Sequence, residues 1–309
     1  MSPLVIYFAS EDLMSAPEPR QHNGETPEEA QAAGREILAI IGQLRQLVDG
    51  HERRSKIQPV KNSEMATDDE VTHPDRLSHL TSSYLNSAND HCRALLTLLD
   101  DGNGGLSILI VALHSHIRAI IEHAALTSWL LSPSDPHERR RRALAAISSE
   151  LTFEKQLVSS INQGRPPETR EQRSTRAKAT RDANRRDRTR QKTLKAAAKA
   201  CGIADDEYSA GLPKWSEILD DASTSSTRFR GGFLPKTIWM LTSGLTHPSA
   251  SRVMLVAAMQ ETRDYGNGTL QVEVTARIGS LVAPLRTATS MLEDAIDWER
   301  YRKAKVAEH

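Results

Sequence analysis

Five ionisable side chains lie in the middle of an otherwise apolar stretch, Leu106 to Leu131 (LSILIVALHSHIRAIIEHAALTSWLL). They are His114, His116, Arg118, Glu122 and His123. On a helix, the i, i+4, i+8 spacing places His114, Arg118 and Glu122 in one stripe, where Arg118 can pair with Glu122. Because Arg and Glu are rarely buried without partners, this stripe should meet polar groups of another helix or face a cleft.

A second stretch offers such groups. The segment from Phe233 to His247 (FLPKTIWMLTSGLTH) has a helical pattern with Trp239, Ser243 and His247 at i, i+4, i+8, and Pro248 ends it. We expect this helix to face the central one, so that a polar cluster forms. Its members are His114, Arg118, Glu122, Ser243 and His247. A buried network that fixes the helix register is favoured over a catalytic site.

The sequence lacks the motifs of several common catalytic and metal-binding sites. No Ser-His-acid context, glycine-rich phosphate loop or zinc-ligand spacing occurs in the sequence. His114 and His116 are two residues apart and cannot chelate from one helix face. The HERRR segment that begins at His137 lacks the second histidine of a metalloprotease. We therefore expect no metal and no cofactor.

Residues 164–199 change composition sharply, with thirteen Lys and Arg against four Asp and Glu, a net charge of +9. A solvated helix that projects from the bundle is favoured over a disordered segment, because Arg and Ala are good helix formers. Such an arm could track a phosphate backbone, and a plain solvated helix or linker fits equally well. It has no aromatic residue, so it would read charge and not sequence. The candidate nucleic-acid-binding residues are Arg173, Arg176, Arg181, Arg185, Arg186, Arg188 and Arg190.

Helices must position these groups. Thr26 and Asp135 are predicted N-caps, each followed by Pro at the first helical position, and Gly202 is a predicted helix end. The run Arg139–Arg142 opposes the dipole of its helix, so it should meet an acidic partner, with Glu122 as a candidate, or a bound anion. The expected regions are a mobile tail (1–26), an N-terminal helix and linker (27–71), a core bundle (72–163), the basic arm (164–202) and C-terminal helices (203–309).

Composition supports an all-α fold. Hydrophobic residues make up 38% of the 309 residues and aromatic residues only 4%, so the core must be aliphatic. The prediction is a helical bundle around a central buried helix, with a basic arm. Residues 249–276 form either a small β-hairpin or a continued helix, because Leu270, Val272 and Val274 alternate with polar residues.

The sequence also bounds the location of the protein. Charged residues inside the central helix argue against a membrane span, and the 40 basic residues balance the 40 acidic ones. Cys92 and Cys201 sit in no metal or redox spacing. The short apolar run Leu4–Ala9 lacks the basic flank of a signal peptide. We expect a cytoplasmic protein that contacts no membrane.

Three segments together resemble the HEPN-like helical proteins of bacteria. They read IRAIIEHAALTSWLL, PHERRRRAL and SGLTH, and the resemblance spans about Arg76 to Lys305 without the basic insertion. The resemblance implies an all-α bundle. Because members of the group are frequently dimeric, it also implies that this chain could form a homodimer. Members of the group include RNA-cleaving toxins and defence effectors beside many proteins of unknown activity.

The RNA-cleaving members carry an Arg and a His that Arg118 and His123 match in spacing, although Ala119 replaces the usual polar residue. The segment also lies mid-chain, whereas the nuclease motif is more usual near the end of the domain. The two side chains diverge by roughly 140° around one helix, so they could act on one group only in a distorted helix or a dimer. The leading prediction is binding of RNA or a protein partner in stress or phage defence. The alternatives are a metal-independent endoribonuclease that uses Arg118 and His123, with His247 as a further candidate, or a structural interaction module. Whether the protein is an enzyme stays open.

Overall fold

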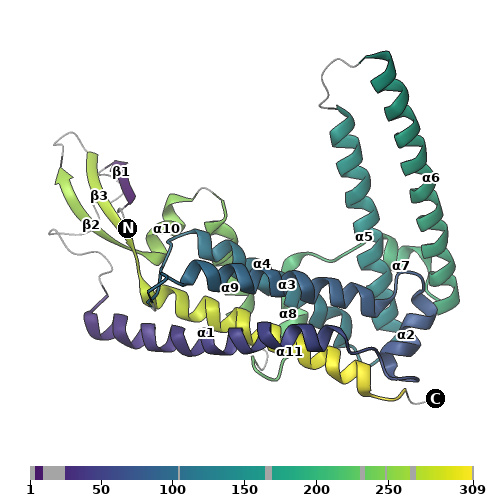
Figure 1. The fold of residues 1–309 in the computed structure, drawn as a ribbon, viewed down its shortest axis with the longest axis horizontal. Helices are drawn as coiled ribbons and strands as arrows, with labels where there is room; N and C mark the ends of the chain where they lie inside the picture. Colours follow the sequence, from purple (N-terminus) through teal and green to yellow (C-terminus); the bar gives the residue numbers. More distant parts are fainter. Residues whose placement is uncertain are drawn as a thin grey trace. The chain divides into compact units, whose positions relative to one another are not determined.

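The computed structural model describes residues 4–9, 25–103, 105–163, 169–229, 234–247, 249–264 and 269–307. Helices dominate this part of the chain, so the predicted all-α bundle is confirmed, with one small sheet beside it (Figure 1). The chain divides into two compact units. Unit 1 comprises 1–56, 85–125 and 223–295, and unit 2 comprises 57–84, 126–222 and 296–309. Along the described chain no helix combines the length and the apolar character that a membrane crossing requires.

The helices of unit 1 enclose an aliphatic core. The complete or partial helices in this unit are α1 (Pro27–Ser55), α3 (Leu77–Leu99), α4 (Ala112–Leu131), α9 (Leu234–Leu245), α10 (Ala250–Val256) and α11 (Val282–Ala304). Among the fully or nearly fully buried residues are Ile37, Leu44, Leu95, Leu113, Ile117, Ile120, Leu285 and Ala288. The predicted cap of α1 is present, because Thr26 and Glu29 form a reciprocal capping box. The helix continues to Ser55.

A three-stranded antiparallel sheet also belongs to unit 1. Its strands are β1 (Leu4–Ala9), β2 (Ala257–Asp264) and β3 (Thr269–Ala276), in the order β1-β3-β2. For residues 249–276 the sequence allowed a β-hairpin or a continued helix. Both are found: α10 occupies Ala250–Val256, and the hairpin of β2 and β3 follows it. The expectation of a mobile tail is wrong for Leu4–Ala9, whose backbone pairs with β3. The rest of that expectation, residues 1–3 and 10–24, lies outside the described residues.

Unit 2 contains a helix in the second part of 27–71, where the sequence predicted a linker after the N-terminal helix. This helix, α2 (Glu64–Thr72), is capped by Ser63, whose hydroxyl accepts a hydrogen bond from the amide of Ala66. It carries no apolar stripe because its buried side chains include Asp68, which pairs with arginines. The other complete or partial helices of the unit are α3, α4, α5 (Pro136–Gln163), α6 (Arg170–Cys201), α7 (Asp205–Ser209), α8 (Trp215–Thr224) and α11.

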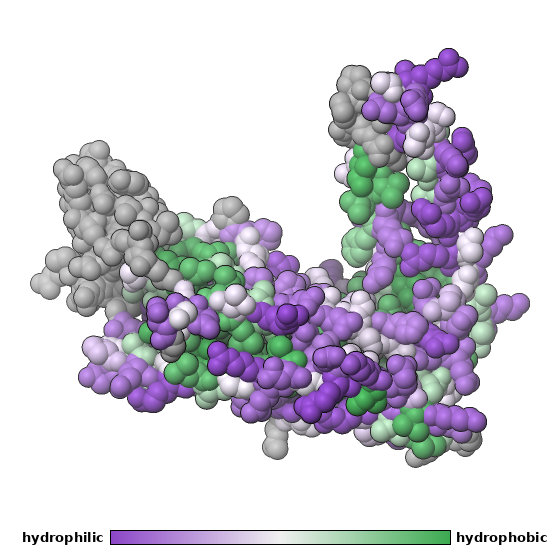
Figure 2. Space-filling view, in the orientation of Figure 1, coloured by the Kyte–Doolittle hydropathy of each residue, from purple (hydrophilic) through white to green (hydrophobic). Residues whose placement is uncertain are grey.

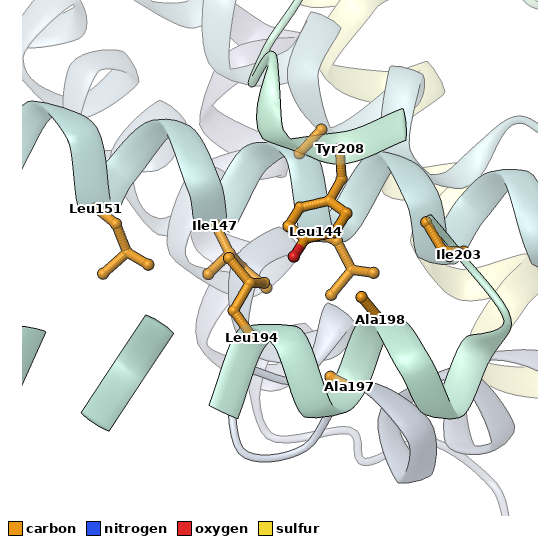
Figure 3. Close-up of a cluster of buried hydrophobic side chains, with 9 residues drawn as sticks. Leu144, Ile147, Leu151, Leu194, Ala197, Ala198, Ile203 and Tyr208 are labelled. Carbon is orange, nitrogen blue, oxygen red and sulfur yellow. The ribbon is translucent and has the colours of Figure 1, made fainter. Parts of the chain in front are cut away.

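The basic segment forms α6, which runs antiparallel to α5 (Figure 1). At the base of this hairpin, apolar side chains of α5, α6 and α7 form one cluster (Figure 3). The cluster reaches Leu151 on α5 and Leu194 on α6. Beyond these residues both helices continue as a helical arm, defined here as 152–163 and 170–193. Gly202 ends α6 in the left-handed conformation, with φ of 70°, as the sequence predicts.

Candidate functional site

Helices α4 and α9 of unit 1 meet through a polar network. Glu122 Oε1 accepts hydrogen bonds from Arg118 Nε and from Trp239 Nε1, both at 2.8 Å. Arg118 also donates to Thr246 Oγ1 at 3.0 Å. The side chains of Arg118 and Glu122 remain 26% and 19% exposed. The network is therefore held together internally and still reaches solvent.

Three other members of the predicted cluster lie elsewhere. Ser243 Oγ is buried and has no hydrogen-bond partner within the described structure, and His247 is exposed. His114 is only 1% exposed, and its burial lowers its pKa to about 4. This histidine is therefore neutral at physiological pH. Thr246 takes the role expected of Ser243 and His247, and no feature of the sequence singled it out.

His123 lies against α3. Its ring stacks on His91, with 5.9 Å between ring centroids, and His91 Nδ1 lies 3.1 Å from His116 Nδ1. Burial lowers the pKa of both His91 and His123, and the neighbouring histidines add to this effect, while Glu122 opposes it. Arg118 and His123 thus contact different helices. Nothing near His91 in the sequence indicated its role, because its two partners follow it by 25 and 32 residues.

The histidine group does not form a metal site. Among the described residues, no three His, Cys, Asp or Glu side chains are arranged so that they could hold a metal ion. Of the side chains that were expected to share one site, Arg118 binds Glu122 and Thr246, His123 stacks on His91 of α3, and His247 is exposed. The polar network of α4 and α9 therefore has the character of a helix-positioning contact with a solvent-exposed edge.

The first arginine run, Arg139–Arg142, faces inward in unit 2. Arg139 is 2% exposed, and its Nε donates to Asp68 at 2.7 Å, while Arg140 donates to the other oxygen of Asp68 at 2.8 Å. Arg141 and Arg142 both bind Glu138. The hydrogen bond from Arg141 lowers the pKa of Glu138 to about 2, and Arg142 adds to this effect.

The acidic partner proposed for this run, Glu122, is therefore wrong. Glu122 is already bound to Arg118 and Trp239, and the partners of the run are Asp68, Glu138 and, through Arg142, Asp221. Asp68 was missed because it lies in the segment predicted to be a linker. Four cations near the N-terminus of α5 interact unfavourably with the helix dipole, and the ion pairs with these carboxylates offset that cost.

The second arginine-rich run faces outward on α6. A surface hollow of about 450 Å³ is lined by Arg181, Asn184, Arg185, Arg188, Thr189 and Lys192, all of them exposed. We call its four cations, Arg181, Arg185, Arg188 and Lys192, the basic stripe. No carboxylate is among these lining residues. Arg185 contacts Asp182 at 3.0 Å, but its side chain remains 79% exposed.

The other predicted nucleic-acid-binding residues lie outside the hollow. Arg173 and Arg186 are exposed, and Arg176 is partly buried. Arg190 is turned toward α5, where it binds Glu154 at 2.7 Å. Lys192 completes the stripe and was not among the residues singled out from the sequence, although its spacing from Arg181, Arg185 and Arg188 places it on the same helix face.

The stripe and the α4–α9 network are thus two different kinds of polar site, one open and one internally paired. No protein family, no curated protein and no solved structure matches this chain. The resemblance to the HEPN-like proteins consequently stays a prediction.

Proposed function

We propose that the protein binds RNA through the basic stripe of α6. The observation that carries this proposal is the hollow on α6, whose lining contains four exposed cations and no carboxylate. Most other arginine clusters in the described chain are paired with carboxylates, as in the pairs of Arg139 with Asp68 and of Arg228 with Asp294. In the basic stripe Arg185 contacts Asp182, but all four cations remain exposed and are therefore available for phosphate groups.

The spacing of the stripe suits an extended polyanion. Its four cations follow each other at i, i+4, i+7 and i+11, so they lie on one face and span roughly 16 Å along the helix. Three of them are arginines, whose planar guanidinium groups match phosphate oxygens in pairs. No aromatic side chain lines the hollow, so we expect binding that depends on charge and little on base sequence.

Phosphate contacts by themselves do not distinguish RNA from DNA. The choice of RNA rests on the resemblance to the HEPN-like group, and so does a role in stress or phage defence. A cytoplasmic location, expected from the two cysteines, belongs to the same proposal. A single-stranded DNA of the same sequence is therefore a necessary comparison in every binding measurement.

The test is a fluorescence anisotropy titration with a labelled single-stranded RNA at several salt concentrations. In the test variant, Arg181, Arg185, Arg188 and Lys192 are all replaced by Gln. If each cation contacts one phosphate, the plot of log association constant against log salt concentration should become less steep by about 3 in this variant. The matched control also removes three arginines and one lysine, all exposed and outside the arm. The positions of the control are Arg35, Arg45, Arg53 and Lys61.

The two variants change the net charge equally, so their comparison separates the stripe from general electrostatics. We expect the control to retain most of the affinity. Equal losses in both variants would contradict a dedicated site, and so would wild-type protein that binds no RNA at low salt. Equal affinity for RNA and DNA would restrict the proposal to single-stranded nucleic acid in general.

The ribonuclease alternative receives less support. A metal-independent mechanism needs a base and a phosphate-stabilising cation around one reacting group. Arg118 is bound to Glu122 and Thr246, whereas His123 stacks on His91 of another helix. Incubation of labelled RNA with the protein in EDTA, beside His123→Ala, tests this alternative. Cleavage products that disappear in the variant would favour it over simple binding.

A further inference from the structure

The basic stripe is the middle part of a longer line of cations on α6. Lys178 lies one helical turn before the stripe, and Lys195 and Lys199 lie in the two turns after it. These three lysines are exposed, as the four cations of the stripe are. Lys195 contacts Asp205 of α7 at 3.3 Å, but its side chain remains 67% exposed. We call the three lysines and the basic stripe together the long basic row.

The spacing of the long basic row keeps it on one face of the helix. Steps of three and of four residues alternate from position 178 to position 199. At this spacing the cations stay within roughly 100° of the helix circumference and span roughly 32 Å along its axis. The helix is continuous over this distance, since α6 extends from Arg170 to Cys201. The row is therefore almost straight and about twice as long as the basic stripe.

The opposite face of α6 makes the contacts with the rest of unit 2. Asp187 and Arg190 pair with α5, and Leu194 and Ala198 lie in the hydrophobic cluster at the base of the hairpin. The middle of the row lies roughly 140° from the middle of these contacts around the helix. Figure 2 shows hydrophilic side chains along the outer edge of α6, away from α5. The row is consequently exposed over its full length.

The straightness of the row selects the kind of nucleic acid. Neighbouring cations are separated by roughly 4.5 or 6 Å along the axis, and their long side chains can adjust to successive phosphates of one strand. A flexible single strand can follow a straight line of cations phosphate by phosphate. In a duplex both backbones wind around the axis, so a straight row crosses them and contacts fewer phosphates. Since α6 contains no aromatic residue, phosphate contacts and not stacked bases determine the affinity.

We infer that one extended single strand of about eight nucleotides binds along the whole long basic row, with one bridging phosphate for each cation. This inference rests on the proposed function and specifies the length and the course of its ligand. Each phosphate that is bound releases counterions, so the affinity and its salt dependence should increase with the length of the strand. Both effects of added contacts should end once the row is filled.

The experiment is a fluorescence anisotropy titration of the full chain with labelled oligouridylates, which do not form base pairs with themselves. Strands of four, six, eight and twelve nucleotides are compared at several salt concentrations. The plot of log association constant against log salt concentration should have a slope of about −2 for the shortest strand and about −5 for the two longest. From four to eight nucleotides the association constant should rise at least about tenfold.

The outer lysines provide the decisive variant. When Lys178 and Lys199 are both replaced by Gln, the slope for the twelve-nucleotide strand should become less steep by about 1.4. The slope for the four-nucleotide strand should stay unchanged, because the basic stripe is intact. The matched control replaces Arg173 and Arg186 by Gln, which removes two exposed cations of α6 that lie off the row. The control should leave both slopes close to those of the wild type, and circular dichroism checks that both variants fold.

Slopes that steepen up to eight nucleotides and then stay constant, together with the effect of the outer lysines, support the inference. Equal slopes for six, eight and twelve nucleotides overturn it and confine binding to the basic stripe. An outer-lysine variant that behaves like the control overturns it as well, and so does tighter binding of a duplex than of a single strand of equal length. In these three cases RNA binding itself persists. Wild-type protein that binds no strand of any length contradicts the proposed function too.

Discussion

Two arginine-rich runs on consecutive helices of unit 2 have opposite environments. Arg139–Arg142 at the start of α5 are bound by Asp68, Glu138 and Asp221, and Arg139 is almost completely buried. The basic stripe on α6 is exposed, and its hollow contains no carboxylate. The number of arginines is therefore a poor guide to function. The position of the nearest carboxylates, which come from distant segments, decides whether an arginine run stabilises the fold or binds a ligand.

The largest effect is expected where a carboxylate of the inner run is removed. Asp68→Ala leaves Arg139 buried and deprives Arg140 of its partner, so the free energy of unfolding should fall by about 3–5 kcal/mol. Urea denaturation measures this change. The control is Asp182→Ala, which removes the exposed partner of Arg185 and should change stability by less than about 0.5 kcal/mol. Similar losses in both variants would erase the contrast between the two runs.

His114 extends the comparison to a buried side chain that stays neutral, in contrast to the buried and paired Arg139. Burial lowers the pKa of His114 to about 4, below the ordinary value of 6.5, so the unfolded chain takes up a proton first as the pH falls. The free energy of unfolding should therefore decline between pH 6.5 and pH 4 by roughly 3 kcal/mol from this group, and the decline should level off below pH 4.

His114→Gln removes this contribution. Even if the variant is less stable at pH 7, its stability should fall less steeply from pH 6.5 to pH 4 than that of the wild type. Thermal or urea unfolding across this pH range measures the two slopes. An unchanged slope would show that His114 takes up a proton equally readily in the folded and unfolded chains, and burial would then not suppress its charge.

Arg118 is intermediate between the two runs, because it is paired with Glu122 but remains 26% exposed. Glu122→Gln keeps an acceptor for Trp239 and removes the negative charge. We expect a loss of about 1 kcal/mol in the free energy of unfolding, which is typical of a partly exposed hydrogen-bonded pair. If the free energy of unfolding fell as much as in Asp68→Ala, the Arg118–Glu122 pair would contribute to stability as strongly as the buried pairs of Arg139–Arg142.

The smallest effect separates two arginines on the same helix. Arg188 lines the hollow of α6, whereas Arg190, two residues away, binds Glu154 of α5. Arg188→Gln should weaken RNA binding by about threefold and reduce the salt slope by about 0.7, which corresponds to one phosphate contact. Arg190→Gln should leave both values close to those of the wild type. Anisotropy titrations compare the two variants, and the reverse order would move the site to another face of α6.

Local signals made much of the helical fold predictable. Thr26 and Gly202 act within their own turns, and the sequence identified both. The α2 helix escaped prediction because its buried face is acidic and its partners, Arg139, Arg140 and Arg302, lie far away in the chain. Likewise, β1 pairs with β3, whose residues follow their partners by 260 to 270 positions.

The polar sites show the same limit. Helical spacing correctly suggested that Arg118 and Glu122 would pair. It could not reveal that Thr246 and Trp239, and not Ser243 and His247, complete the network, because the rotation of α9 depends on its packing. On α6, spacing alone could not separate Arg190 from Arg188, since the direction of α5 decides which of them faces solvent.

The end of the hydrophobic cluster at Leu151 and Leu194 has a consequence for dynamics. Beyond that point the helices of the arm are joined by exposed ion pairs, which resist separation weakly. Amide hydrogens of residues 152–163 should therefore exchange with solvent much faster than those near Leu144. Local opening of the arm should therefore cost less free energy than opening of its base, so the arm should be able to change its curvature along a bound ligand while the base stays folded.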